Sequence, residues 1–287
     1  MNKAILTKKE ANLLLNAQKL GHSFFLTSFD LDLTKEKVLI KKNGFEIRGV
    51  LIPTKEFERL KEETFYVVEG EKLLSIDFFG GDTNLYYKLK PTHDWPTVML
   101  SSVPMHRFKT ISPKTSANLM AKEISPIEGK VLDTCCGLGY TAIISSKTAD
   151  EVTVFEKDGN VLRIAEYNPY SRELFNNPKI KLIQESVFEG IKKLKENSFD
   201  RILHDPPTVS FAKELYFPEF YKELLRVLKP NGVLYHYCPN PGKTKGTEFH
   251  LTIIKNLEKA GFSECAFVPL ASGVRAVKIL NQEKKKK

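Results

Sequence analysis

Two motifs that lie far apart in the chain have the composition of a ligand-binding site. The first is an apolar run that ends in Asp133 and leads into a tight turn containing Gly137 and Gly139. The second, Asp205-Pro206-Pro207, directly follows another apolar run. Because ligands of open α/β sheets sit outside the carboxyl ends of the strands, we expect both motifs to face the same crevice.

The glycine turn favours a nucleotide ligand. Residues without a Cβ allow a sharp bend and a close approach of the ligand to the backbone, and the following helix offers free N–H groups at its start. Ala142 is tolerated by the dinucleotide fingerprint Gly-x-Gly-x-x-Gly, so the spacing leaves a nicotinamide cofactor open. Glu156 follows the next expected strand, where a carboxylate can accept hydrogen bonds from both hydroxyls of a ribose.

The elements that must position these residues alternate between strand and helix over residues 96–287. The expected strands are 130–134, 151–155, 180–184, 199–204, 232–237, 264–269 and 274–279, and the expected helices are near 114–124, 140–147, 158–168, 187–194, 213–228 and 247–260. This alternation predicts an α/β fold, a doubly wound, Rossmann-like and mostly parallel sheet with helices on both faces. The last two strands are close enough in sequence to form an antiparallel hairpin.

Residues 1–95 are expected to form a separate, small β-rich domain. Its predicted elements are a helix at 8–20 and strands at 23–28, 37–41, 46–52, 64–68, 72–78 and 84–89. Basic and acidic residues nearly balance there, so the domain is no obvious electrostatic clamp, and both a structural cap and substrate recognition remain open. Residues 90–118 contain four prolines and are expected to form a stiff, non-helical joint.

Composition excludes several classes of protein. The net charge is +9, of which Lys284 to Lys287 supply four, so the rest of the chain is only mildly basic. No run approaches the about 18 apolar residues of a membrane span, and residues 1–10 lack the apolar core of a signal peptide. The four cysteines include no Cys-x-x-Cys pair, which predicts a cytoplasmic protein without a metal site. The oligomeric state stays open.

The glycine loop, Glu156 and the second motif, in their order along the chain, resemble the motifs of the class I S-adenosylmethionine-dependent methyltransferases. The resemblance covers about residues 110–280. The resemblance implies S-adenosyl-L-methionine as the cofactor, with Glu156 on the ribose, and Cys135 in place of the usual first glycine of the loop. The cofactor contacts that it implies are Asp133, Cys135, Gly137, Gly139, Glu156, Lys157, Glu185, Ser186 and Asp205.

The second motif resembles the acceptor-side motif of the members that methylate amino groups, and this implies catalytic roles for Asp205, Pro206 and Pro207. An exocyclic amino nitrogen needs hydrogen-bond acceptors that draw it toward a tetrahedral geometry. Asp205 and the Pro206 carbonyl could each accept one N–H, since prolines hold that carbonyl rigidly and donate no competing N–H. No cysteine lies between Cys136 and Cys238, which argues against methylation of a pyrimidine ring carbon.

The substrate contacts are predicted from residue type. Thr208 stands where the stronger form of the second motif has an aromatic residue, and Phe211, Tyr216 or Phe217 could stack on a base instead. The remaining predicted substrate contacts are basic residues of two loops: His106, Arg107 and Lys109, and Lys243 and Lys245. Either loop is equally compatible with a solvated basic surface.

The whole chain is similar to an archaeal and thermophile group of predicted RNA methyltransferases. We therefore predict methylation of a nucleobase amino group in ribosomal or transfer RNA, with the cytosine amino group of ribosomal RNA as the narrow form, and RNA as the partner. A small-molecule or polyamine-type transferase on the same fold is the alternative, supported by Thr208 and the weak charge of the front domain. A cofactor-dead RNA-binding protein and a methyltransferase of glutamine amides are further alternatives.

Overall fold

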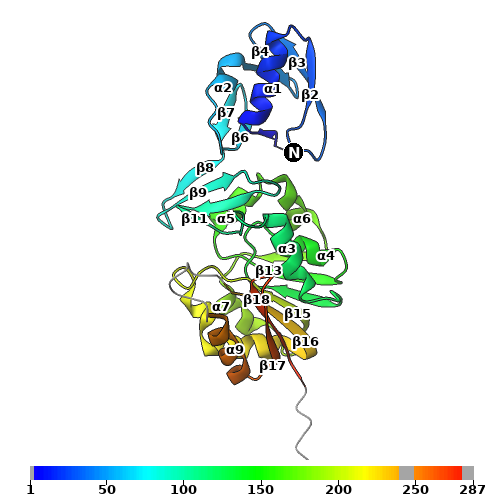
Figure 1. Ribbon diagram of the computed structural model, residues 1–287, viewed down its shortest axis with the longest axis vertical. Helices are drawn as coiled ribbons and strands as arrows, with labels where there is room; N and C mark the ends of the chain where they lie inside the picture. The colour runs from blue at the N-terminus through cyan, green and yellow to red at the C-terminus, as the bar shows by residue number, and fades with distance from the viewer. Residues whose placement is uncertain (1–2, 239–248, 280–287) are drawn as a thin grey trace, which may run out of the picture. The chain divides into compact units, whose positions relative to one another are not determined.

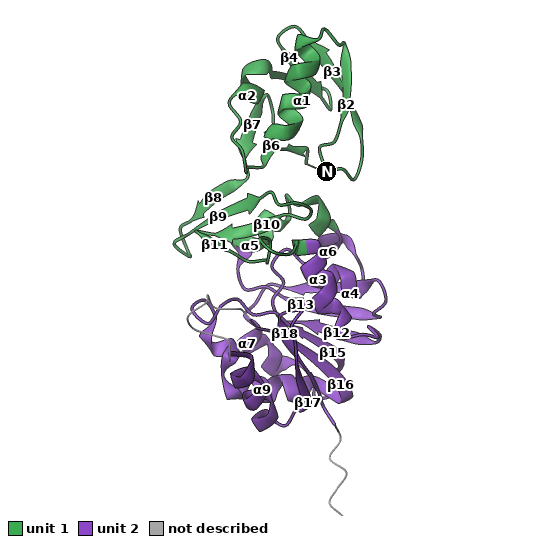
Figure 2. Ribbon diagram, viewed as in Figure 1, with its two compact units in different colours: residues 1–113, 160–172 green, residues 114–159, 173–287 purple. Residues whose placement is uncertain are grey.

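A computed structural model describes residues 3–238 and 249–279 of the chain (Figure 1). The chain divides into two compact units (Figure 2). The first comprises Met1–Pro113 with Asn160–Arg172, and the second comprises Lys114–Gly159 with Glu173–Lys287. The first unit thus runs past residue 95 and takes in a segment from the α/β half of the sequence.

The core of the second unit is a seven-stranded sheet in the order β14-β13-β12-β15-β16-β18-β17. Its strands are β12 (Lys130–Asp133), β13 (Glu151–Phe155), β14 (Ile180–Ile183), β15 (Phe199–His204), β16 (Leu228–Tyr237), β17 (Ser263–Val268) and β18 (Gly273–Val277). The first five of these are parallel, whereas β18 runs antiparallel to both β16 and β17. The predicted doubly wound, Rossmann-like fold and its late antiparallel hairpin are confirmed.

Helices connect the strands. They are α3 (Pro113–Lys122), α4 (Tyr140–Ser146), α5 (Gly159–Ala165), α6 (Arg172–Asn176), α7 (Val187–Gly190), α8 (Pro218–Val227) and α9 (Phe249–Ala260), with 3-10 turns η1 (Pro169–Ser171), η2 (Ile191–Lys193) and η3 (Lys213–Tyr216). The helix expected at 213–228 is divided at Phe217, which has an extended backbone. The reason is Pro218, which donates no backbone N–H and disfavours a helical conformation in the residue before it.

The buried face of α8 joins the sheet to the remaining helices. Phe220, Leu224 and Val227 lie in one apolar cluster with Ile202 of β15 and Leu234 of β16, all almost completely buried. Burying a side chain of this size contributes about 1.5–3 kcal/mol to folding. This packing fixes the carboxyl end of β15, where Asp205 follows. Within residues 3–238 and 249–279, no helix is long and apolar enough to cross a membrane.

The first unit is rich in β-structure, with three small antiparallel sheets ordered β1-β6-β7, β11-β10-β9-β8 and β2-β3-β4-β5. Its elements are β1 (Ile5–Leu6), α1 (Lys8–Lys19), β2 (Phe24–Thr27), β3 (Glu36–Lys41), β4 (Gly44–Ile47), β5 (Val50–Pro53), α2 (Thr54–Glu58), β6 (Tyr66–Glu69), β7 (Lys72–Ser75), β8 (Asp77–Gly80), β9 (Leu85–Lys90), β10 (Thr97–Leu100) and β11 (Val103–Pro104). Strands β10 and β11 extend the sheet of β9, so part of the expected proline-rich joint is paired structure.

The strand expected at residues 46–52 is broken by a tight turn. Ile47 pairs with Val50, and the two residues between them, Arg48 and Gly49, have φ of 50° and 82°. Two-residue hairpins favour positive φ at both central positions, and glycine supplies this at no steric cost. The sequence signal was the single glycine inside an otherwise strand-like run.

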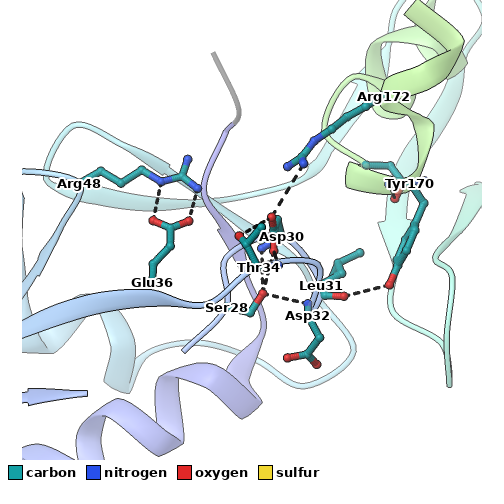
Figure 3. A network of polar contacts seen from close by, with 10 residues as sticks. Ser28, Asp30, Leu31, Asp32, Thr34, Glu36, Arg48, Tyr170 and Arg172 are labelled. Atoms are coloured by element: carbon teal, nitrogen blue, oxygen red, sulfur yellow. Dashed lines mark hydrogen bonds and ion pairs between the residues drawn. The ribbon is translucent and has the colours of Figure 1, made fainter. Parts of the chain in front are cut away.

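A buried carboxylate organises the loop after β2 within the first unit (Figure 3). Asp30 accepts hydrogen bonds from the hydroxyl of Ser28 (2.9 Å) and from the amide and hydroxyl of Thr34 (both 2.8 Å). Arg172 lies 3.8 Å from the same carboxylate, and the hydroxyl of Tyr170 donates to the carbonyl of Leu31. Burial alone would raise the pKa of Asp30, but these hydrogen bonds and the Arg172 charge lower it. The loop after β2 is thereby tied to the segment around η1.

Candidate active site

Asp133 holds the glycine loop from within. Its side chain is fully buried and accepts hydrogen bonds from the Thr141 hydroxyl (2.6 Å) and from the Cys135 amide (3.3 Å). Burial raises the pKa of Asp133 to about 6 despite both bonds. The carboxylate therefore fixes the path of the loop between β12 and α4.

The two glycines of this loop occupy the backbone conformation that favours glycine. Gly137 has a φ of 54° and Gly139 a φ of 77°. A Cβ on Gly139 would also lie 2.9 Å from the Leu174 side chain, closer than real Cβ contacts. The turn can therefore bring the start of α4 close to a ligand, which is the property that the sequence predicted for it.

Glu156 lies beside the glycine turn. One carboxylate oxygen accepts the Gly137 amide and the other accepts the Asp158 amide, each at 2.9 Å. Burial raises the pKa of Glu156 to about 7, although both hydrogen bonds oppose this. Since each carboxylate oxygen has two acceptor sites, Glu156 keeps the capacity to accept two further hydrogen bonds. That capacity fits the two hydroxyls of a ribose.

Asp205 stands at the carboxyl end of β15, the strand that pairs with β12 in the centre of the sheet. Across the described residues, no hydrogen bond to its carboxylate is found. Burial, together with the negative charge of Asp133, raises the pKa of Asp205 to about 7. A carboxylate with this pKa can accept a proton near neutral pH.

Three acidic residues gather around Cys135. After burial, the negative charges of Glu156, Asp205 and Asp133 raise the pKa of its thiol. Within the part of the chain that the structure describes, no lysine or arginine offsets the raised pKa of Asp133 or Asp205. The loop side of the crevice is therefore acidic and favours a cationic ligand.

A buried aromatic cluster lies behind Asp205. His204 and His236 pack edge to face with ring centroids 4.5 Å apart, and the Tyr221 hydroxyl contacts Nε2 of His236 at 3.0 Å. Burial lowers the pKa of both imidazoles, that of His236 to about 4, so both are neutral at physiological pH. The Tyr216 hydroxyl donates to the carbonyl of Pro207 at 2.9 Å and thereby restrains the loop that carries Asp205.

The other predicted cofactor contacts lie at strand ends of the second unit. Lys157 is half exposed, with Nζ 3.9 Å from a Glu214 oxygen. Glu185 forms an ion pair with Lys193, and Ser186 precedes α7 without a side-chain capping bond. Lys157 follows β13, as Glu156 does. Glu185 and Ser186 follow β14, the strand that pairs with β13.

The predicted substrate contacts are divided between the two units. His106, Arg107 and Lys109 belong to the first unit. His106 shares a hydrogen bond with the Thr97 hydroxyl (3.0 Å), and burial lowers its pKa to about 4, so it carries no charge for a phosphate.

The remaining predicted substrate contacts, and the second motif, belong to the second unit. Pro206 is buried, the exposed Thr208 shares a hydrogen bond with Ser210, and Phe211 is partly buried. Lys243 and Lys245 lie outside the described residues. The contribution of Thr141 was missed, and a hydroxyl in the first turn of α4 was the available signal for it. Tyr216, predicted as a candidate stacking residue, donates a hydrogen bond to the Pro207 carbonyl.

Comparison with known proteins identifies relatives of the chain. A family described as "Conserved hypothetical protein 95" matches residues 108–268. The uncharacterized protein MJ1233 of Methanocaldococcus jannaschii is 40% identical over 286 residues, which cover 95% of both chains. Polyamine aminopropyltransferases match a shorter segment. That of Prochlorococcus marinus MIT 9215 is 27% identical over 42% of this chain and 44% of its own, and that of Sulfurisphaera tokodaii is 35% identical over 35% of each. The match thus spans less than half of these transferases.

Solved structures support the fold. A spermidine synthase in complex with the transition-state analogue AdoDATO has a TM-score of 0.58 at 18% identity, covering 70% of this chain and 72% of its own. The spermidine synthase of Thermotoga maritima has a TM-score of 0.55 at 17% identity, covering 70% and 71%. At these identities the likeness shows a common fold.

These comparisons correct the predicted function. The methylation of an RNA base is wrong, because polyamine aminopropyltransferases are among the relatives with a named activity. The error came from the resemblance of the Asp205-Pro206-Pro207 motif to that of enzymes that methylate amino groups, since a carboxylate at this strand end can serve other amine acceptors as well. The polyamine-type alternative is the one that the relatives favour.

Proposed function

The chain belongs to the family described as "Conserved hypothetical protein 95", and within that family we propose that it is a polyamine-type aminopropyltransferase. Its donor is decarboxylated S-adenosylmethionine, and its acceptor is an amine nitrogen of a polyamine. The relatives support this reaction, and the acidic crevice around Cys135 is the observation that carries it.

The argument is electrostatic. The decarboxylated donor lacks the negative carboxylate of S-adenosylmethionine, so its net charge is more positive by one unit. Asp133, Glu156 and Asp205 gather near the glycine loop with no cation among the described residues to balance Asp133 or Asp205. A ligand carboxylate placed there would meet like charges, whereas the ammonium of an aminopropyl group would meet opposite ones. A polyamine acceptor is likewise a cation.

Each residue has a role that follows from its contacts. Glu156, fixed by two backbone amides, accepts hydrogen bonds from the ribose of the donor. Gly137 and Gly139 let the loop approach the donor closely. Asp205 accepts a proton from the acceptor ammonium, because its pKa of about 7 makes it a base at the pH of the cell.

The donor supplies a sulfonium centre whose adjacent methylene carbon is electrophilic. Asp205 first removes one proton from the acceptor ammonium, which frees the lone pair of the nitrogen. The nitrogen then forms a bond to that carbon as the carbon–sulfur bond breaks, and the electron pair stays on sulfur as a neutral thioether. The site must align nitrogen, carbon and sulfur and exclude water.

Donor binding tests the proposal without turnover. In calorimetric titrations at pH 7.5, we expect decarboxylated S-adenosylmethionine to bind at least about tenfold more tightly than S-adenosylmethionine, a difference of about 1.4 kcal/mol. Added salt should reduce the preference, because screening weakens the repulsion of the carboxylate. S-adenosylmethionine binding as tightly as the decarboxylated donor would contradict the electrostatic argument.

A further inference from the structure

We propose that His204 is a positioning residue that holds the loop of Asp205 against the start of the glycine loop, an inference that rests on the proposed function for its catalytic consequence. His204 ends β15 and is fully buried, directly before Asp205 in the chain. One ring nitrogen, Nδ1, lies 2.7 Å from the Thr134 hydroxyl, and the other, Nε2, lies 3.3 Å from the Leu215 carbonyl.

The partners of the ring fix its tautomer. A carbonyl oxygen only accepts, so Nε2 must carry the hydrogen that points at Leu215. Burial and the neighbouring His236 lower the pKa of His204, so the ring is neutral and Nδ1 accepts the hydrogen of the Thr134 hydroxyl. The imidazole therefore connects two segments with one hydrogen bond on each side.

These two segments are the ones that the proposed reaction must align. Thr134 follows Asp133 and begins the glycine loop, and its amide also bonds to the Leu203 carbonyl (3.0 Å). Leu215 lies in η3 at the far end of the loop that starts with Asp205, and the next residue, Tyr216, donates back to Pro207. The loop is thus held near its start through Pro207 and at its end through Leu215 and Tyr216.

The burial of His204 supports a positioning role over mere packing. The neighbouring interior positions of β15, Ile202 and Leu203, are apolar and buried without polar contacts to satisfy. An imidazole in such a position leaves two unpaired polar groups unless both bonds form. Its direct cross-strand partner, His236, satisfies its own ring through Tyr221 and the Tyr237 carbonyl, so it does not compete for Thr134 or Leu215.

Two substitutions separate the two bonds. In His204→Gln the side-chain amide nitrogen can take the place of Nε2 and keep the bond to Leu215. In His204→Asn the shorter amide reaches only the Thr134 side, so the Leu215 bond is lost. Hydrogen–deuterium exchange of a peptide spanning residues 205–217 reports the loop directly, because the amides of Phe211 and Leu215 are hydrogen-bonded within it.

We expect exchange of residues 205–217 to accelerate about tenfold in His204→Asn and to stay within about twofold of wild type in His204→Gln. Peptides from β12 and β13 serve as the internal reference for global unfolding, and His22→Asn, an exposed position, is the control substitution. Unchanged exchange in His204→Asn, or an equal increase in both variants, would overturn the inference. If His204→Asn does not fold, the wild-type protein provides the test. Its ¹⁵N spectrum should show His204 protonated at Nε2, and protonation at Nδ1 would overturn the inference.

The kinetic measurement depends on the proposed reaction, whereas the exchange measurement does not. With decarboxylated S-adenosylmethionine and a polyamine, kcat should fall about a hundredfold in His204→Asn and recover in His204→Gln, since a displacement of about 1 Å can have that effect. Donor Kd should stay within about twofold in both, because Glu156 is untouched. A wild-type protein without transferase activity, with the exchange pattern intact, would contradict the proposed function and leave the positioning role standing.

Discussion

Replacing Asp205 with asparagine is expected to lower the rate of aminopropyl transfer about a thousandfold at saturating donor, since loss of a general base has effects of this size. Asparagine keeps the shape of the side chain but cannot take the proton of the acceptor ammonium. The measurement is steady-state turnover with saturating donor and polyamine, combined with calorimetric titration of the donor. In the wild type, turnover should fall as the pH drops below about 7, because Asp205 becomes protonated.

The same substitution should stabilise the protein at pH 8. The pKa of Asp205 is raised from 3.8 to about 7 in the folded protein, chiefly by burial. A carboxyl of this kind contributes stability that is complete below pH 3.8 and is lost as the pH rises through about 7. Asparagine has no charge to bury, so Tm at pH 8 should rise in Asp205→Asn and change little at pH 4.

The control for Asp205→Asn is Asp150→Asn, which removes an exposed carboxylate of the same unit. It should change neither turnover nor Tm appreciably. Turnover retained in Asp205→Asn would remove Asp205 from its role as the base. A fall in Tm at pH 8 would show that its burial is not the source of its raised pKa.

Replacing Glu156 with glutamine should weaken donor binding about a hundredfold, or about 2.8 kcal/mol, the range expected for hydrogen bonds to a charged acceptor. The Glu156 carboxylate accepts the amides of Gly137 and Asp158 on separate oxygens. Glutamine has one carbonyl oxygen, so its NH₂ group would face one of those amides and disturb the turn. The Kd of the donor should therefore change far more than kcat at saturation.

A matched control exists on the same strand. Glu151 begins β13 and forms only an exposed ion pair with Lys130, 3.6 Å apart. Exposed pairs of this kind contribute about 0–1 kcal/mol, so Glu151→Gln should bind the donor as the wild type does. Equal donor affinity in Glu156→Gln and Glu151→Gln would exclude Glu156 from the donor site.

The sequence predicted the sheet and the meeting of its two motifs for a physical reason. Parallel strands bring their carboxyl ends to one edge, so Asp133, Glu156 and Asp205 had to lie at the same edge once their strands were recognised. The pattern of apolar runs and turns was enough for that. The structure adds a hydrogen bond from the Gly137 amide to Glu156, which the sequence did not predict.

What the sequence could not provide was the electrostatic environment. Asp133 accepts hydrogen bonds from the Thr141 hydroxyl and the Cys135 amide inside the protein, and no spacing rule predicts these contacts. The acidity of the crevice arises because residues from three strands converge, whereas net charge averages over the whole chain. The predicted RNA substrate depended on the resemblance of the second motif, which carries no information about the surrounding charges.

The most direct test of the central claim is the identity of the nucleoside product. The purified chain is incubated with equal concentrations of decarboxylated S-adenosylmethionine and S-adenosylmethionine, together with a mixture of linear polyamines, and the products are separated by mass spectrometry. Aminopropyl transfer predicts 5′-methylthioadenosine as the nucleoside product and a polyamine longer by one aminopropyl group, both absent with Asp205→Asn. S-adenosylhomocysteine as the product, with a methylated acceptor and no lengthened polyamine, would contradict the account.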